Sequence, residues 1–184
     1  MQNNEQVGVL GEITAKFYDQ SSLNILDRLF NSLLEKIRPN FPRVMKLYRL
    51  GELVDVDQHK NVICNAGFNA IARRLTNDYT YSGYINKMVL GTGVATPAAA
   101  DVKLVTEAYR NNTASATANG NEAYLTAYFT EVECSGTYTE FGNFIDGAAG
   151  ADTGKLWSHI GGLNWVKTNL VVLVVSCKYT FASV

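Results

Sequence analysis

The sequence contains few of the side chains that enzymes and metalloproteins use for chemistry. Its 184 residues include two histidines and three cysteines, Cys64, Cys134 and Cys177. The cysteines form no C-x-x-C pair, so their spacing favours neither a zinc site nor a redox pair. Their odd number and wide separation predict free thiols in a reducing compartment. We therefore expect no metal and no cofactor.

Long hydrophobic runs are also lacking. The longest apolar run, from Leu170 to Val175, has six residues, whereas a membrane-spanning helix needs about 20. Residues 1–25 lack the basic, apolar and small-residue order of a secretory signal. Lys and Arg total 16 against 17 Asp and Glu, so the net charge is −1 and draws the chain to neither nucleic acid nor membrane. We expect no membrane partner, and nucleic acid is a disfavoured one.

Neither histidine lies in a pattern typical of catalysis, because a nucleophilic site needs a base beside a Ser or Cys. His59 lies in the polar segment 57–60, which favours a solvated ring. His159 follows Trp157 by two residues, so strand alternation predicts that both side chains share one face and that the imidazole is packed or lies at the rim. We predict that the protein is not an enzyme.

Hydrophobic periodicity divides the chain into an N-terminal arm and a larger β region. Residues 7–17 alternate as a half-buried strand, and a second extended piece covers about 44–56. Between them one helical stripe carries Leu23, Leu26, Phe30, Leu33, Leu34 and Ile37. This strand-helix-strand arm, residues 1–56, is predicted to serve in docking or oligomerisation.

Residues 57–184 are predicted to form a β-sandwich. A second helix is expected over 61–75, with loops at 111–121 and 146–154. Strands are expected at 84–90, 123–129, 139–145, 156–160 and 165–181. The predicted fold is mainly β with two helices (α+β), an antiparallel β-sandwich with the helices packed at one side.

Three groups of residues are candidate interaction surfaces. Tyrosine provides a large contact area at low entropic cost, so Tyr79, Tyr81 and Tyr84 indicate an interface, a sugar platform or the rim of the sandwich. On the helix, Leu23, Leu26, Phe30 and Leu33 indicate either core or a surface that pairs with copies of the chain. The third group is the basic set Lys36, Arg38 and Arg43. It is typical of a solvated surface, a protein contact or a nucleic-acid-facing patch.

A series of short motifs follows in order along residues 57–182. It begins with K-N-V-I-C-N-A-G-F-N at 60–69 and continues with I-N-K-M-V-L-G-T-G at 85–93. Then come Thr96, Pro97, Asp101, Leu104, Glu107 and Arg110, and finally T-E-F-G-N-F at 139–144. Together these motifs resemble a module of tailed-bacteriophage virion proteins, found in tail fibre, baseplate-associated and minor structural proteins.

Seven motif residues have a structural interpretation. Asn65 and Gly67 suit a strand-to-helix transition, and Pro97 follows the glycine turn. Gly91 and Gly93 predict a tight turn with positive φ. Glu107 and Arg110 are expected to pair across a connection.

The resemblance implies a β-sandwich that oligomerises or docks on a virion ring without catalysis. We therefore expect a structural piece of a tail appendage, namely a fibre, baseplate or collar/neck component. It would assemble in the bacterial host cytoplasm and reside at the tail or neck of the virion. The expected partners are other virion proteins and copies of the chain, as a trimer or hexamer.

Two alternatives remain open at this stage. One is a capsid decoration or head-fibre protein, which would share the sandwich. The other is a carbohydrate-binding module that binds a host glycan through Tyr79, Tyr81, Tyr84, Trp157 or Trp165.

Overall fold

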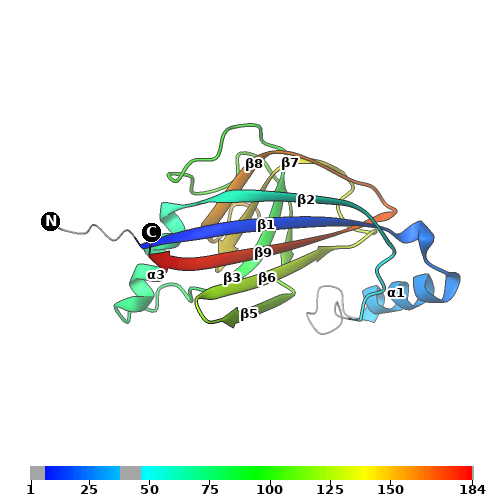
Figure 1. The fold of residues 1–184 in the computed structure, drawn as a ribbon, viewed down its shortest axis with the longest axis horizontal. Helices are drawn as coiled ribbons and strands as arrows, with labels where there is room; N and C mark the ends of the chain where they lie inside the picture. Colours follow the sequence, from blue (N-terminus) through cyan, green and yellow to red (C-terminus); the bar gives the residue numbers. More distant parts are fainter. Residues whose placement is uncertain (1–6, 38–46, 184) are drawn as a thin grey trace.

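The computed structural model describes residues 7–37 and 47–183, which fold into two layers of antiparallel strands (Figure 1). The strands are β1 (Val7–Asp19), β2 (Glu52–Ile63), β3 (Ile85–Gly91), β4 (Glu107–Asn112), β5 (Ser115–Asn119), β6 (Glu122–Phe129), β7 (Gly136–Ile145), β8 (Lys155–Lys167) and β9 (Val171–Ser183). The helices are α1 (Ile25–Ile37), α3 (Asn65–Leu75) and the short 3-10 turn η1 (Gln20–Ser22). The predicted class, mainly β with two α-helices, is confirmed.

One strand connects the two layers. The strand order is β4-β3-β7-β8-β2-β1-β9-β6-β5. Along most of its length β2 pairs with β1, but Val62 and Ile63 pair instead with His159 and Ser158 of β8. The front layer of Figure 1 is therefore β2-β1-β9-β6-β5, and the rear layer is β8-β7-β3-β4.

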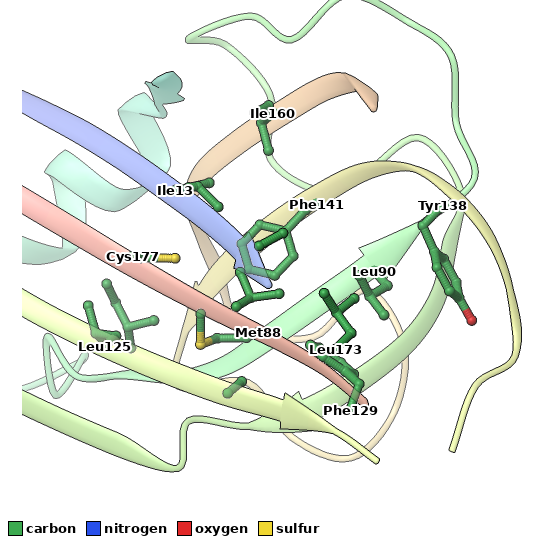
Figure 2. Close-up of a cluster of buried hydrophobic side chains, with 14 of the residues drawn as sticks. Ile13, Met88, Leu90, Leu125, Phe129, Tyr138, Phe141, Ile160, Leu173 and Cys177 are labelled. Carbon is green, nitrogen blue, oxygen red and sulfur yellow. The ribbon is translucent and has the colours of Figure 1, made fainter. Parts of the chain in front are cut away.

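The main core fills the space between the layers. Alternate residues of the front strands point inward, among them Ile13, Leu125 and Leu173, and they meet Met88 and Phe141 from the rear layer (Figure 2). All five side chains are buried. Burial of such side chains contributes roughly 1.5–3 kcal/mol each, so this cluster is the principal source of stability for both layers.

The helices lie at opposite ends of the long axis, not together at one side as expected from the sequence (Figure 1). Helix α3 packs on β8, where Phe68 meets Trp157 edge-on with ring centroids 5.8 Å apart. Helix α1 follows β1 at the far end of the molecule. The domain boundary at residue 56 stays a prediction. However, β1 lies inside the sheet, with β2 and β9 paired on its two sides, so among the described residues of segment 7–56 it is α1 that lies outside the sheet.

Several predicted element bounds were wrong. The extended piece expected to end at 56 continues as β2 to Ile63, so the second helix begins at Asn65. The single strand expected over 165–181 is interrupted after Lys167 by a turn in which Val171 N donates to Thr168 O. The loop expected over 111–121 contains β5, which forms a hairpin with β6 around Gly120, whose φ is +58°.

Candidate functional site: loop anchors and an exposed helix

A buried carboxylate on β7 holds the long loop that joins β3 to β4. The Glu140 side chain is fully buried, yet its oxygens accept hydrogen bonds from the backbone N–H groups of Gly93, Val105 and Thr106 at 2.8, 3.0 and 2.8 Å. Buried charges are tolerated where hydrogen bonds compensate for lost hydration. Glu140 therefore fixes both ends of loop 92–106 on the outer face of the rear layer.

A histidine extends this anchor to the middle of the loop. His159 Nε2 lies 3.0 Å from Glu140 Oε2, and its Nδ1 lies 2.7 Å from Asp101 Oδ2. Burial would raise the pKa of Asp101, but the Ala98 N–H and His159 together hold it below its usual value. Both ring nitrogens face carboxylate oxygens, so the imidazole bridges Glu140 and Asp101.

The buried position of His159 agrees with the predicted packed imidazole, but the shared face with Trp157 was wrong. Between β7 and β8 the register shifts, so that Asn143 pairs with Ser158 and Phe144 with Leu156. Trp157 is therefore an extra, bulged residue, and a bulge breaks the alternation of side chains. Trp157 joins the main core, whereas His159 faces loop 92–106.

The glycines of the L-G-T-G motif are needed for a reason that differs from the prediction. Neither Gly91 nor Gly93 is among the positive-φ residues, so the expected left-handed turn is wrong. A Cβ added at Gly91 or Gly93 would lie 2.6 or 2.5 Å from Glu140 Oε1. These positions have no side chain because the anchoring carboxylate occupies that space.

A second anchor holds the loop between β7 and β8, and it confirms the predicted pairing of Glu107 with Arg110. The pair is bidentate, with N–O distances of 2.5 and 2.6 Å, and both side chains are almost fully buried. Arg110 Nη1 also donates to Ala148 O and Thr153 Oγ1. Loop 146–154, which was predicted as a loop, is thereby fixed to β4.

The remaining motif residues help one element approach another. A Cβ at Gly67 would lie 2.6 Å from Trp157 Cε3, so Gly67 allows α3 to pack closely on β8. Asn65 N donates to Ala99 O at 2.8 Å, which ties the helix start to loop 92–106. Pro97 packs over Gly161 of β8, where an added Cβ would lie 3.0 Å from Pro97 Cδ.

The motifs thus mark two loop anchors rather than a reactive centre. Glu140 and Asp101 belong to the sequence motifs but were not predicted as site residues. The signal for Glu140 was a lone acidic side chain in the aromatic and glycine-rich segment 138–144. Among residues 7–37 and 47–183, no three His, Cys, Asp or Glu side chains gather in a way that could hold a metal ion.

The tyrosine cluster is only partly available to a ligand. Tyr79 and Tyr84 are exposed, with the Arg74 guanidinium 4.3 Å above the Tyr79 ring, while Tyr81 packs against the main core. Trp157 and Trp165 are buried core residues, 2% and 1% exposed. They cannot serve as surface platforms for a sugar, which corrects that part of the glycan-binding expectation.

Helix α1 is fastened to the sandwich by polar contacts. The buried Asn31 amide donates to Arg49 O and accepts from Arg49 N, both at 2.8 Å. The Tyr48 hydroxyl lies between the carboxylates of Glu35 and Glu131, at 3.2 Å from Glu35 Oε1. Burial and the nearby charges of Glu133 and Glu131 raise the pKa of Glu35.

The opposite side of α1 is an apolar surface, and its side chains belong to none of the buried hydrophobic clusters of the described residues. We call it the α1 stripe, and its members are Ile25, Leu26, Leu29, Leu33 and Ile37, which are 75, 77, 63, 52 and 59% exposed. The predicted helical stripe contained Leu26, Leu33 and Ile37 of this surface and missed Ile25 and Leu29. Of its other members, Phe30 is 37% exposed and Leu23 is half-buried. Leu34 is half-buried and packs against the buried cluster that contains Tyr48, Val172 and Val174.

One of the three residues of the predicted basic group can be placed. Lys36 is exposed on the last turn of α1. Arg38 and Arg43 lie outside the described residues. Neither described helix has the length and apolar character needed to cross a membrane.

Comparison of the chain with protein-family models, with curated proteins and with solved structures finds no match.

Proposed function

We propose that the protein is a non-enzymatic structural subunit of a tailed-phage virion, which forms or attaches a tail appendage by docking and self-association. The α1 stripe is the observation that carries this proposal. Soluble monomers rarely expose apolar patches of more than a few hundred Å² unless the patch binds a partner. Five large aliphatic side chains more than half exposed on one short helix fit that rule.

The two loop anchors support the same role from the other side of the molecule. An assembly subunit needs a surface whose shape is set before its partner arrives, since ordering a loop on binding costs affinity. Glu140 and the Glu107–Arg110 pair supply that order with buried, charge-assisted hydrogen bonds. The phage assignment itself rests on the motif resemblance, to which these anchor residues belong.

Immunogold labelling of purified virions, with copy number counted by quantitative mass spectrometry, tests the proposal. Label at the tail or neck in low multiples of three or six copies per particle is the expected result. Label over the head in high copy number would identify a capsid decoration or head-fibre protein instead. Absence from the particle would overturn the virion role.

A further inference from the structure

Four of the five side chains of the α1 stripe have the same order in both directions along the helix. Ile25, Leu29, Leu33 and Ile37 are spaced by four residues, so they follow one another along one side of the helix. Read forward or backward the series is Ile-Leu-Leu-Ile, centred on Asn31. A two-fold interface brings a surface against itself in the reverse direction. An antiparallel pair of α1 helices would therefore match isoleucine with isoleucine and leucine with leucine at these four positions.

Net charge does not oppose the pairing of α1 with a second copy. Asp27, Arg28, Glu35 and Lys36 sum to zero, so two copies of the helix do not repel each other through net charge. Antiparallel pairing also places the two helix dipoles in opposite directions, which is favourable, whereas parallel pairing would bring like ends together.

The position of α1 leaves the stripe accessible to another copy. The helix lies at one end of the long axis, away from α3 and from both loop anchors (Figure 1). Its polar side is already occupied, since the Asn31 amide and the Tyr48 hydroxyl bind it to the sandwich. The side that remains is apolar, as the centre of a helix-pair interface should be.

From this self-complementarity we infer that α1 is a dimerisation element, which binds α1 of a second copy in an antiparallel, two-fold pair. Leu29 packs against Leu33 of the second copy, and Ile25 against Ile37 of the second copy. The inference rests on the proposed assembly role and gives it a partner. Because it concerns the purified protein, its failure can be told from failure of the virion assignment.

Sedimentation velocity of the full-length protein tests the pair directly. The wild type is expected to sediment as a dimer, with twice the mass of one chain. The double variant Leu29→Glu/Leu33→Glu is expected to sediment as a monomer, because it buries four carboxylates in the pair. The matched control, Leu75→Glu/Val94→Glu, changes two residues that are 84 and 86% exposed elsewhere and should remain a dimer. Circular dichroism of each variant checks that the fold is intact.

Cysteine cross-linking tests the direction of the helices. In a Cys134→Ser background, Ile25→Cys protein mixed with Ile37→Cys protein should give disulfide-linked 25–37 pairs under mild oxidation. The two remaining cysteines, Cys64 and Cys177, are buried. A wild type that is monomeric or trimeric, or a dimer that links 25 to 25 and 37 to 37, would overturn the antiparallel pair. A dimeric protein that is absent from virions would leave the pair standing and remove the virion role.

Discussion

The rear layer and helix α1 distribute polar and apolar side chains in opposite ways. In the rear layer, ionisable groups are inside: Glu140, His159 and Arg110 are buried, and each has hydrogen-bond partners. On α1 the amide of Asn31 is buried while the five aliphatic side chains of the α1 stripe face solvent. Both regions carry residues that the sequence marked as functional, yet only the second leaves those residues free to contact anything else.

Residues marked by a sequence pattern can serve either the fold or a contact with a partner. Where all polar atoms of a motif residue are bonded within the chain, the residue acts on the fold, and here it fixes loops 92–106 and 146–154. Where apolar side chains stay exposed although the chain could have polar ones there, the fold gains nothing from them. Substitutions should therefore separate the regions, with large stability effects at the anchors and small ones on the α1 stripe.

The largest stability loss is expected for Glu140→Ala. Its removal leaves three backbone N–H groups and a histidine without their acceptor in a buried site. Breaking a buried ionic group of this kind costs about 3–5 kcal/mol. Urea unfolding followed by tryptophan fluorescence measures the free energy of unfolding. Glu12→Ala, at an exposed carboxylate on β1, is the control. Equal values for the two variants would contradict the role given to Glu140.

A smaller loss is expected for Gly93→Ala. The added methyl group would lie 2.5 Å from Glu140 Oε1 and overlap Val105 Cβ, so either the anchor or the loop must shift. Overpacking of this kind costs about 1–3 kcal/mol. Gly150→Ala is a matched control, since its Cβ would meet nothing closer than Thr153 Cγ2 at 3.8 Å. A Gly93→Ala protein as stable as the control would show that the carboxylate does not require this glycine.

Much of the fold could be predicted from periodicity, because alternation and helical spacing record which face is buried. The β-rich class, the strand at 7–17, the α1 region and the 123–129 strand were all predicted. Part of what failed depended on partners distant in the sequence. The β5 hairpin is polar and short, and it is a strand because β6 pairs with it. The turn after Lys167, by contrast, is local, and the polar residues Thr168 and Asn169 between two apolar segments were a signal for it that the prediction of one long strand passed over.

The candidate sites were predicted less completely than the fold. The Glu107–Arg110 pair is local, three residues apart, and it was predicted correctly. The Glu140 anchor joins residues up to 47 positions apart, and the sequence contains no sign that the Gly93 N–H is its partner. The same limit applies to Gly91 and Gly93. The sequence predicted that glycine is needed at both positions, but it is needed because a side chain from another strand fills the space, not because of the backbone angle.

Acid should act on the two regions in opposite directions. The pKa of Glu35 is raised above its ordinary value of 4.5, so above pH 4.5 the folded protein binds more protons than the unfolded chain. The attachment of α1 therefore weakens as the pH rises through the range in which folded Glu35 loses its proton. The pKa of Asp101 is lowered below its ordinary value of 3.8, so its contribution to the stability of the loop anchor is fully present above pH 3.8. That contribution is lost as the pH falls through the lower pKa of the folded state. Acidification from neutral pH toward 4.5 should therefore strengthen α1 attachment before the loop anchor weakens.

Hydrogen-exchange protection factors, resolved by segment, measure this pH dependence. Protection of residues 25–37 should rise on acidification, while that of loop 92–106 should stay constant until the pH falls below 3.8. Glu35→Gln removes the titrating group and should make α1 protection high and independent of pH. A variant that keeps the wild-type pH dependence would show that another group controls the helix.

The smallest stability effect is expected for Leu33→Glu, measured on dilute, monomeric protein. Leu33 is 52% exposed and packs against no described core cluster, so its replacement should change the free energy of unfolding by about 0.5 kcal/mol or less. Leu173→Ala, in the main core, should cost about 2–5 kcal/mol under the same conditions. At higher protein concentration the wild type should gain stability through association, and Leu33→Glu should not. If Leu33→Glu were as costly as a core substitution in the monomer, the stripe would belong to the fold, and its exposure would no longer argue for a partner.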